Sequence, residues 1–191
     1  ELVSYTRRFL RFKSTIDPRT RRRLAVHPGP LDSEQAQSLA GDIVAVADFF
    51  SLPLDLFLGI GAMENNYINA KGDIGHASWK PRAAKGDVVL RRKAGRVLVL
   101  NESMGVWQIT RETLRYAHLL YRADKRDYSR LPEHLRPPKT LDLSEVEPSV
   151  LTTYAGVLFR HLMDQLGGDV AKAVGAYNGG PGRPNMQYEA G

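Results

Sequence analysis

One glutamate stands at the end of a strongly apolar segment of this chain. Glu64 directly follows residues 54–63, LDLFLGIGAM, whose apolar character on nearly every side is typical of a buried helix. Burial disfavours the charged form of a carboxyl group and raises its pKa towards the range in which it donates a proton near neutral pH. Glu64 is therefore a candidate general acid, although a surface carboxylate at a helix end would give the same pattern.

Two further motifs carry side chains that could bind a polar ligand, SMGVWQI at residues 103–109 and AYNGG at residues 176–180. Their candidate residues are Ser103, Gly105, Gln108, Tyr177 and Asn178. Each motif also has a plain structural interpretation. Gly105 suits a tight turn, Gln108 suits the start of a helix, and Tyr177 suits a core aromatic ring with a solvated hydroxyl.

Length and composition indicate one globular domain with excess positive charge. The chain has 191 residues, of which 42% are hydrophobic and 25% are charged, as expected for a folded domain with a core. Its formal net charge is +6, and cations cluster at residues 7–8, 19–23 and 91–93. This balance suits an anionic partner such as nucleic acid, acidic lipid or a negatively charged cell-wall polymer, and it also suits solubility alone.

The composition excludes several kinds of chemistry. The chain has no cysteine, which removes disulfides, thiolate nucleophiles and cysteine-based zinc sites. No apolar run reaches the roughly twenty residues of a membrane span, although an upstream signal or anchor could have preceded Glu1. The histidines lie far apart without ligand spacing, so we expect no metal and no organic cofactor. They are His27, His76, His118, His134 and His161.

The elements that must position these side chains are mostly helical. Residues 1–30 are basic and punctuated by proline, which predicts one short helix followed by an extended arm. Asp32 and Ser33 supply N-cap chemistry for the next helix. Pro53 starts a second helix, which carries Glu64 at its end.

The second half of the chain combines one hairpin with further helices. Residues 68–86 are typical of a loop, and 87–101 contain two β-rich runs around Lys-Ala-Gly, which predicts a hairpin. A helix over 110–122 and a polar connection over 123–143 follow. The pattern at 144–147 predicts a capping box for a long apolar helix.

Two glycines, Gly167 and Gly168, are expected to stop that helix, and Asp169 is expected to cap another short one. The pattern shows no internal repeat and no domain linker. The prediction is a predominantly helical α+β fold in a single domain.

In combination and in this order, the three motifs resemble the lytic transglycosylase family, the lysozyme-like SLT domain of glycoside hydrolase family 23. The family pattern is Glu-Ser on a buried helix, then Gly-Leu-Met-Gln, then Ala-Tyr-Asn-Ala-Gly. Here Glu64 stands at the acid, GVWQ at residues 105–108 and AYNGG at 176–180. The resemblance covers about residues 40–182 and implies a lysozyme-like domain with one inserted β-hairpin.

The expected organisation is a basic arm over residues 1–30 and the SLT domain over 31–191. Three positions depart from the family pattern: Asn65 stands in place of Ser, Trp107 in place of Met, and Thr152 in place of a common Asn. The first two motifs also lie farther apart than in compact members of the family. The predicted hairpin and the loop before it fill this extra length.

The resemblance implies cleavage of the β-1,4 bond between MurNAc and GlcNAc in peptidoglycan, with a 1,6-anhydromuramoyl product. Glu64 would be the general acid and then the base, because the substrate's N-acetyl group and 6-hydroxyl replace a second carboxylate. Tyr177 would lie near the acid and orient it or the N-acetyl group. The implied substrate-binding residues are Ser103, Gly105, Gln108, Tyr177 and Asn178.

The resemblance also implies the enzyme's partners and location. The partner would be peptidoglycan glycan strands and not nucleic acid, and the enzyme would be a monomer in the periplasm or outside the cell. The cations at 91–93 and Arg96 lie in the predicted hairpin, which we expect to flank the glycan groove and to bind the wall through screened attraction.

Two other functions fit the same sequence. A hydrolase like goose-type lysozyme would need a second carboxylate at about 6.5–9.5 Å from Glu64 if it were inverting, and Asp73, Asp87 and Glu102 are candidates. Glu102 is also a rival acid, since Ser103 follows it, but it follows a predicted strand instead of a buried helix. The third possibility is a non-catalytic module that binds glycan or nucleic acid through its arginines.

Overall fold

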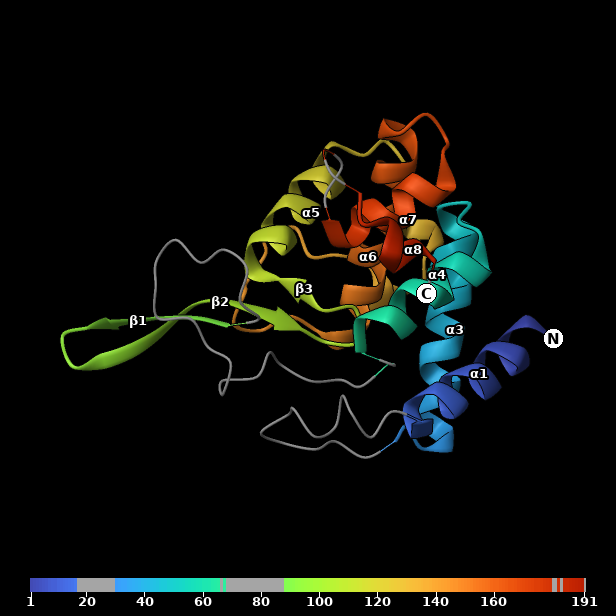
Figure 1. The fold of residues 1–191 in the computed structure, drawn as a ribbon, viewed down its shortest axis with the longest axis horizontal. Coiled ribbons are helices and arrows are strands. Elements are labelled where there is room, and N and C mark those ends of the chain that lie inside the picture. Colours follow the sequence, from blue (N-terminus) through green and yellow to red (C-terminus); the bar gives the residue numbers. More distant parts are fainter. Residues whose placement is uncertain (17–29, 66, 68–87, 180–181, 183, 191) are drawn as a thin grey trace.

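A computed structural model describes residues 1–16, 30–65, 67, 88–179, 182 and 184–190 of the chain (Figure 1). Its helices are α1 (Leu2–Ile16), α3 (Ser33–Phe49), α4 (Leu54–Asn65), α5 (Arg111–Ala123), α6 (Pro148–Gln165), α7 (Val170–Gly179) and α8 (Met186–Glu189). Its strands are β1 (Val88–Lys93), β2 (Arg96–Met104) and β3 (Ile109–Thr110). The predicted α+β class, predominantly helical with a small sheet, is confirmed.

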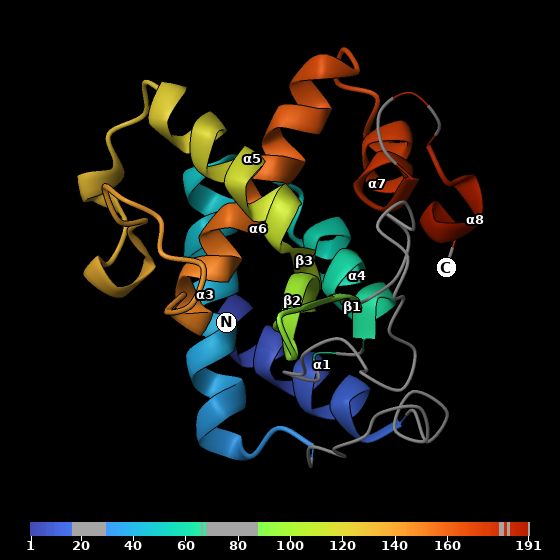
Figure 2. The same cartoon turned by 90° about the vertical axis from the view of Figure 1, so that its left-hand side faces the viewer.

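Helix α6 forms the centre of the helical body. It packs against α3, α5 and α7, and its residues 150–159 are all buried (Figure 2). The ring of Phe159 stacks against Phe57 of α4, with ring centroids 6.5 Å apart. The helix with Glu64 at its end therefore packs through Phe57 against the most buried part of the core.

Most of the predicted helix boundaries are confirmed. Asp32 is the N-cap of α3, and its side chain accepts a hydrogen bond from the backbone N–H of Gln35 while the Gln35 side chain accepts from the Asp32 N–H. Asp169 accepts a hydrogen bond from the backbone N–H of Lys172 at the start of α7. Gly167 and Gly168 follow α6 with positive φ, as a helix stop requires.

The predicted capping box at residues 144–147 is wrong. The hydroxyl of Ser144 donates to the carboxylate of Asp142 in a local turn, and α6 begins at Pro148 with Glu147 as N-cap and no side-chain capping bond. Proline has a fixed φ and no N–H, so the first helical position suits it, and the helix begins there instead. The polar connection before it contains two short 3₁₀ helices, Tyr128–Arg130 and Glu133–Leu135.

Helix α1 is packed onto the body of the protein. It lies along α3, and its Leu10 is fully buried in the common core. The predicted short helix in the N-terminal region is thus present, although its inner face belongs to the core. The division into an arm over residues 1–30 and a domain over 31–191 stays a prediction.

The hairpin predicted at residues 87–101 is present and is longer than expected. Strand β1 pairs antiparallel with β2, and β2 pairs with the two-residue strand β3, which the sequence pattern does not predict. Figure 1 shows the turn end of this hairpin extending away from the helices. The sheet end of the hairpin leads directly into the second motif.

Several predicted features lie outside the described residues. They are the loop carboxylates Asp73 and Asp87, the arginines at 19–23, and the histidines His27 and His76. Among the helices that the structure describes, none has the length and apolar character needed to cross a membrane.

Candidate active site

Glu64 lies in the last turn of α4 and is half-buried. Its Oε1 accepts a hydrogen bond from the hydroxyl of Tyr188 at 2.8 Å, and the same hydroxyl lies 3.2 Å from the carbonyl oxygen of Ile60, one turn earlier in α4. A phenol hydroxyl can donate one hydrogen bond and accept others. Tyr188 can therefore donate to an ionised Glu64, or accept from a protonated one while donating to Ile60.

Tyr188 is the site residue that sequence reasoning missed. It belongs to the four-residue helix α8, whose N-cap is Asn185. The Asn185 side chain accepts hydrogen bonds from the N–H groups of Gln187 and Tyr188, and its own amide donates to Oδ1 of Asn178 at 2.9 Å. Asn178, which was predicted to bind substrate, is exposed. Through Asn185 it holds the helix that brings Tyr188 to Glu64.

A glycine lets α8 approach the third motif closely. A Cβ atom on Gly175 would lie 2.9 Å from the carbonyl oxygen of Asn185, which is too close for any larger residue. The Asn185 N–H also donates to the carbonyl oxygen of Gly175 at 2.9 Å. The available signal was an asparagine three residues before an aromatic, Asn185 and Tyr188, but it gave no indication of a contact with Glu64.

Tyr177 lies close enough to Glu64 for the glutamate charge to act on it. Burial, and then the negative charge of Glu64, raises the pKa of Tyr177 well above its usual value. Its hydroxyl oxygen is buried and has no hydrogen-bond partner among the residues that the structure describes. Burial and the Glu64 charge also raise the pKa of Tyr188, so both phenols stay neutral.

The second motif forms a tight turn between β2 and β3. Gly105 has φ +69°, a left-handed conformation that glycine adopts without strain, and Gln108 has φ +48°. The side-chain amide of Gln108 donates to the carbonyl oxygen of Gly105 at 2.8 Å. Gln108, predicted to bind substrate, therefore folds back onto its own turn.

The turn packs on the helix that carries Glu64. The indole ring of Trp107 stacks on Phe57 of α4, with centroids 4.5 Å apart and an interplanar angle of 12°. Its Nε1 donates to Oγ1 of Thr152 in α6 at 3.0 Å, and both residues are fully buried. Two of the departures from the family pattern therefore contact each other.

Tyr67 fixes the chain just after Glu64. It is fully buried with φ +63°, and its hydroxyl donates to the carbonyl oxygen of Leu58 in α4. Its ring meets Trp107 edge-on, with centroids 6.4 Å apart. The second motif and the segment after Glu64 thus pack around the same helix.

Glu102 has a different environment from Glu64. It is buried in β2, and its Oε1 forms an ion pair with the guanidinium of Arg111 at 3.0 Å. The neighbouring Ser103 is also buried and lies opposite Thr110 in the β2–β3 pair. The structure therefore places Glu102 in a structural ion pair at the start of α5.

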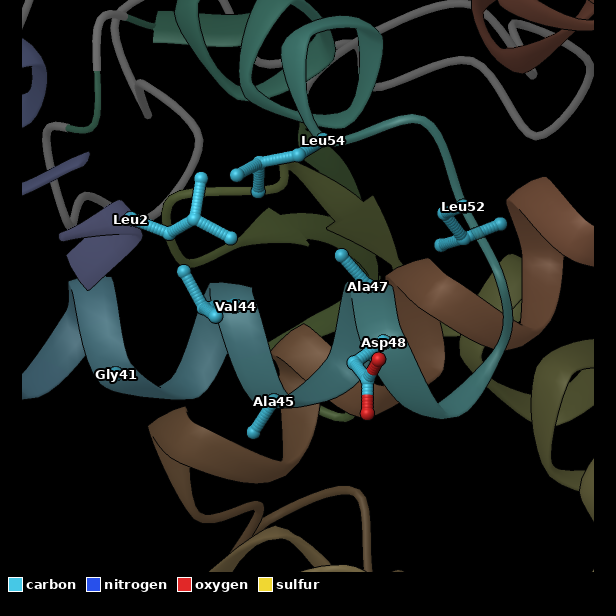
Figure 3. A pocket seen from close by; sticks show the side chains of 8 residues that line it. All are labelled: Leu2, Gly41, Val44, Ala45, Ala47, Asp48, Leu52 and Leu54. Atoms are coloured by element: carbon cyan, nitrogen blue, oxygen red, sulfur yellow. The ribbon is translucent and has the colours of Figure 1, made fainter. Parts of the chain in front are cut away.

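A shallow hollow of about 410 Å³ lies elsewhere, between the start of α1, helix α3 and the start of α4 (Figure 3). Its lining is apolar except for the carboxylate of Asp48. The lining residues are Leu2, Gly41, Val44, Ala45, Ala47, Asp48, Leu52 and Leu54. None of the candidate site residues lines it. Glu64 lies at the opposite end of α4.

One comparison with known proteins gives a match. The family model described as "Transglycosylase SLT domain" matches residues 77–190, more than half of the chain. The matched segment contains the second and third motifs and α8, and it begins after Glu64. No curated protein and no solved structure matches the chain.

Proposed function

Because the chain belongs to the family of transglycosylase SLT domains, we propose that it is a peptidoglycan lytic transglycosylase that cleaves the MurNAc–GlcNAc β-1,4 bond with a 1,6-anhydromuramoyl product. Glu64 is the general acid and base. The observation that supports this role is its position at the end of an apolar helix, with the hydroxyl of Tyr188 at 2.8 Å and Tyr177 nearby.

The reaction begins with proton transfer from Glu64. Its proton passes to the glycosidic oxygen as the bond from that oxygen to C1 breaks, and the carbonyl oxygen of the substrate's N-acetyl group bonds to C1. The 6-hydroxyl oxygen of the same MurNAc residue then displaces the N-acetyl oxygen and gives its proton to the Glu64 carboxylate. Glu64 is restored, and no water is consumed.

Tyr188 and Tyr177 have distinct roles in this scheme. Tyr188 holds the Glu64 carboxyl group through both halves of the cycle, because a phenol can donate to the carboxylate and accept from the acid. Tyr177 offers a buried hydroxyl with no partner among the described residues, which can donate to the N-acetyl group as charge develops there.

The other candidate residues bind the glycan or support the site. The second motif forms one wall of the glycan-binding site through Ser103, Gly105 and Gln108. Asn178, at the end of α7, contacts the glycan and also accepts a hydrogen bond from Asn185. The protein needs no metal or organic cofactor for this reaction. It acts as a monomer on peptidoglycan glycan strands in the cell envelope, in the periplasm or outside the cell.

The test is digestion of purified peptidoglycan in ¹⁸O-labelled water, followed by mass spectrometry of the muropeptides. We expect 1,6-anhydromuramoyl ends that carry no label. Labelled reducing ends would overturn this function and favour a lysozyme-like hydrolase. Such a hydrolase would need a second carboxylate; Asp73 and Asp87 lie outside the described residues, and Glu102 is paired with Arg111.

A further inference from the structure

The β1–β2 hairpin is a ribbon whose turn end projects from the protein (Figure 1). Its two-residue turn, Ala94 and Gly95, has positive φ at both positions. The backbone twist of such a turn matches the right-handed twist of the two flanking strands. All side chains from Arg91 to Leu98 are exposed. The ribbon is therefore a defined surface that lies outside the helical core.

The strand register gathers three cations on one face of this ribbon. Lys93 lies directly opposite Arg96, and Arg91 lies opposite Leu98. Side chains two residues apart on a strand share a face, so these four side chains point to the same side. Neighbouring positions on that face are roughly 5–7 Å apart.

This arrangement costs stability in the absence of an anion. Like charges directly opposite each other on paired strands are destabilising, and Lys93 and Arg96 are such a pair. Within the described part of the chain, Arg91, Lys93 and Arg96 have no acidic partner. An anionic ligand with carboxylates a few ångströms apart would relieve this repulsion.

We propose that the face formed by Arg91, Lys93 and Arg96 binds the carboxylate groups of the peptide stems that branch from the glycan strand. The inference rests on the proposed function for its substrate, peptidoglycan. The negative charges of this polymer lie mainly on its stems, while the sugar backbone that the active site cleaves is mostly uncharged. The exposed Leu98 on the same face gives an apolar contact for the short side chains of a stem.

The experiment measures binding to insoluble peptidoglycan as a function of salt. The ribbon variant is Arg91→Thr, Lys93→Thr and Arg96→Thr, with threonine chosen because it suits a strand. The matched control removes three exposed cations elsewhere, by Arg115→Gln, Lys125→Gln and Lys139→Gln. Both variants have a net charge three units lower, so the comparison separates the position of the lost charges from their number.

We expect the ribbon variant to bind about ten-fold more weakly at low salt, with the difference vanishing at high salt, because exposed charges act through screened attraction. The control variant should bind like the parent chain. The parent chain should lose the same ten-fold when carbodiimide coupling to ammonia has converted the stem carboxylates to neutral amides, and the ribbon variant should lose nothing further.

Equal losses in the ribbon and control variants would overturn the proposal, because net charge alone would then explain binding. Retention on phosphatidylglycerol vesicles through the same cations, with no effect of amidating the stem carboxylates, would overturn it in favour of a lipid surface. If the triple variant fails to fold, the single variant Lys93→Glu at the turn end serves in its place, and unchanged binding by it counts against the proposal.

The outcome is separable from that of the proposed function. A parent chain that binds stems through the ribbon but releases no 1,6-anhydromuramoyl product would remove the function and leave the inference standing. A chain that releases this product while the ribbon variant binds as well as the parent would do the reverse.

Discussion

Two glutamates of this chain lie in protected positions but have different partners. Glu64, half-buried at the end of α4, meets the hydroxyl of Tyr188, whereas Glu102, buried in β2, meets the guanidinium of Arg111. A phenol is neutral and both donates and accepts, but a guanidinium is permanently positive and only donates. The first environment accommodates both protonation states of a carboxyl group, and the second forms an ion pair only with a charged one.

The comparison shows that burial alone does not identify a general acid. Glu102 is the more buried of the two glutamates, and Ser103 follows it. A choice based on burial and on the family's Glu-Ser pattern would therefore select Glu102. The chemistry of the partner points to Glu64 instead. The following predictions test this distinction.

Replacing Glu64 should have the largest effect. Glu64→Gln keeps the shape of the side chain but cannot donate a carboxylic proton, so we expect cleavage of peptidoglycan to fall by at least about 10²–10⁴-fold. The measurement is the rate of muropeptide release, with thermal unfolding to verify that the fold is kept. A variant that retains a tenth of the parent activity would show that another group supplies the proton.

The two tyrosines near Glu64 should be distinguishable by stability. Tyr177→Phe and Tyr188→Phe should each lower kcat by roughly ten-fold with little change in KM, because each hydroxyl acts on the reacting state. Tyr177→Phe should leave the free energy of unfolding unchanged or raise it, since it removes a buried hydroxyl without a partner among the described residues.

Tyr188→Phe should lower the free energy of unfolding by about 1 kcal/mol, since it removes hydrogen bonds to Glu64 and Ile60. Denaturant titration of both variants measures the contrast. Equal stability losses would mean that Tyr177 also has a structural partner, and the proposed role of its hydroxyl towards substrate would be wrong.

The turn between β2 and β3 connects the surroundings of the two glutamates. It directly follows β2, which contains Glu102, and its Trp107 stacks on Phe57 of α4, which contains Glu64. Thr152→Val leaves the indole N–H of Trp107 buried without its acceptor, and we expect a loss of about 1–3 kcal/mol in the free energy of unfolding. Activity should fall several-fold, although Thr152 itself touches no proposed catalytic group.

The matched control is Thr152→Ser, which keeps the hydroxyl acceptor and removes one methyl group. Most of the stability and activity should return in this variant. If valine and serine at position 152 behave alike, the hydrogen bond from Trp107 contributes nothing, and packing alone holds the turn.

Local sequence patterns predicted much of the fold. The cap at Asp32, the apolar run before Glu64, the hairpin and the Gly167–Gly168 stop are all confirmed, because each depends on residues close together in the chain. The capping box at 144–147 failed, because Pro148 offered a better helix start three residues later than expected.

The site was less accessible to sequence reasoning because its contacts are distant in the chain. Tyr188 reaches Glu64 across 124 positions, from a helix of four residues that is too short to show any periodicity. Trp107 and Thr152 were recognised only as two separate departures from the family pattern. Their hydrogen bond, across 45 positions, shows that the two residues contact each other.

Replacing Glu102 should have the smallest effect on activity and would sharpen the comparison most directly. Glu102→Gln removes the charge that pairs with Arg111 but keeps an oxygen that can accept a hydrogen bond from the guanidinium. Because Arg111 is partly exposed, the loss in the free energy of unfolding should be about 1 kcal/mol. We expect the rate of muropeptide release to stay within about two-fold of the parent, since no proton passes through an ion-paired carboxylate in the proposed reaction. The same rate and stability measurements on Glu64→Gln supply the reference. If Glu102→Gln loses as much activity as Glu64→Gln, two carboxylates take part in cleavage, and a hydrolase with Glu102 as its second group becomes the better description.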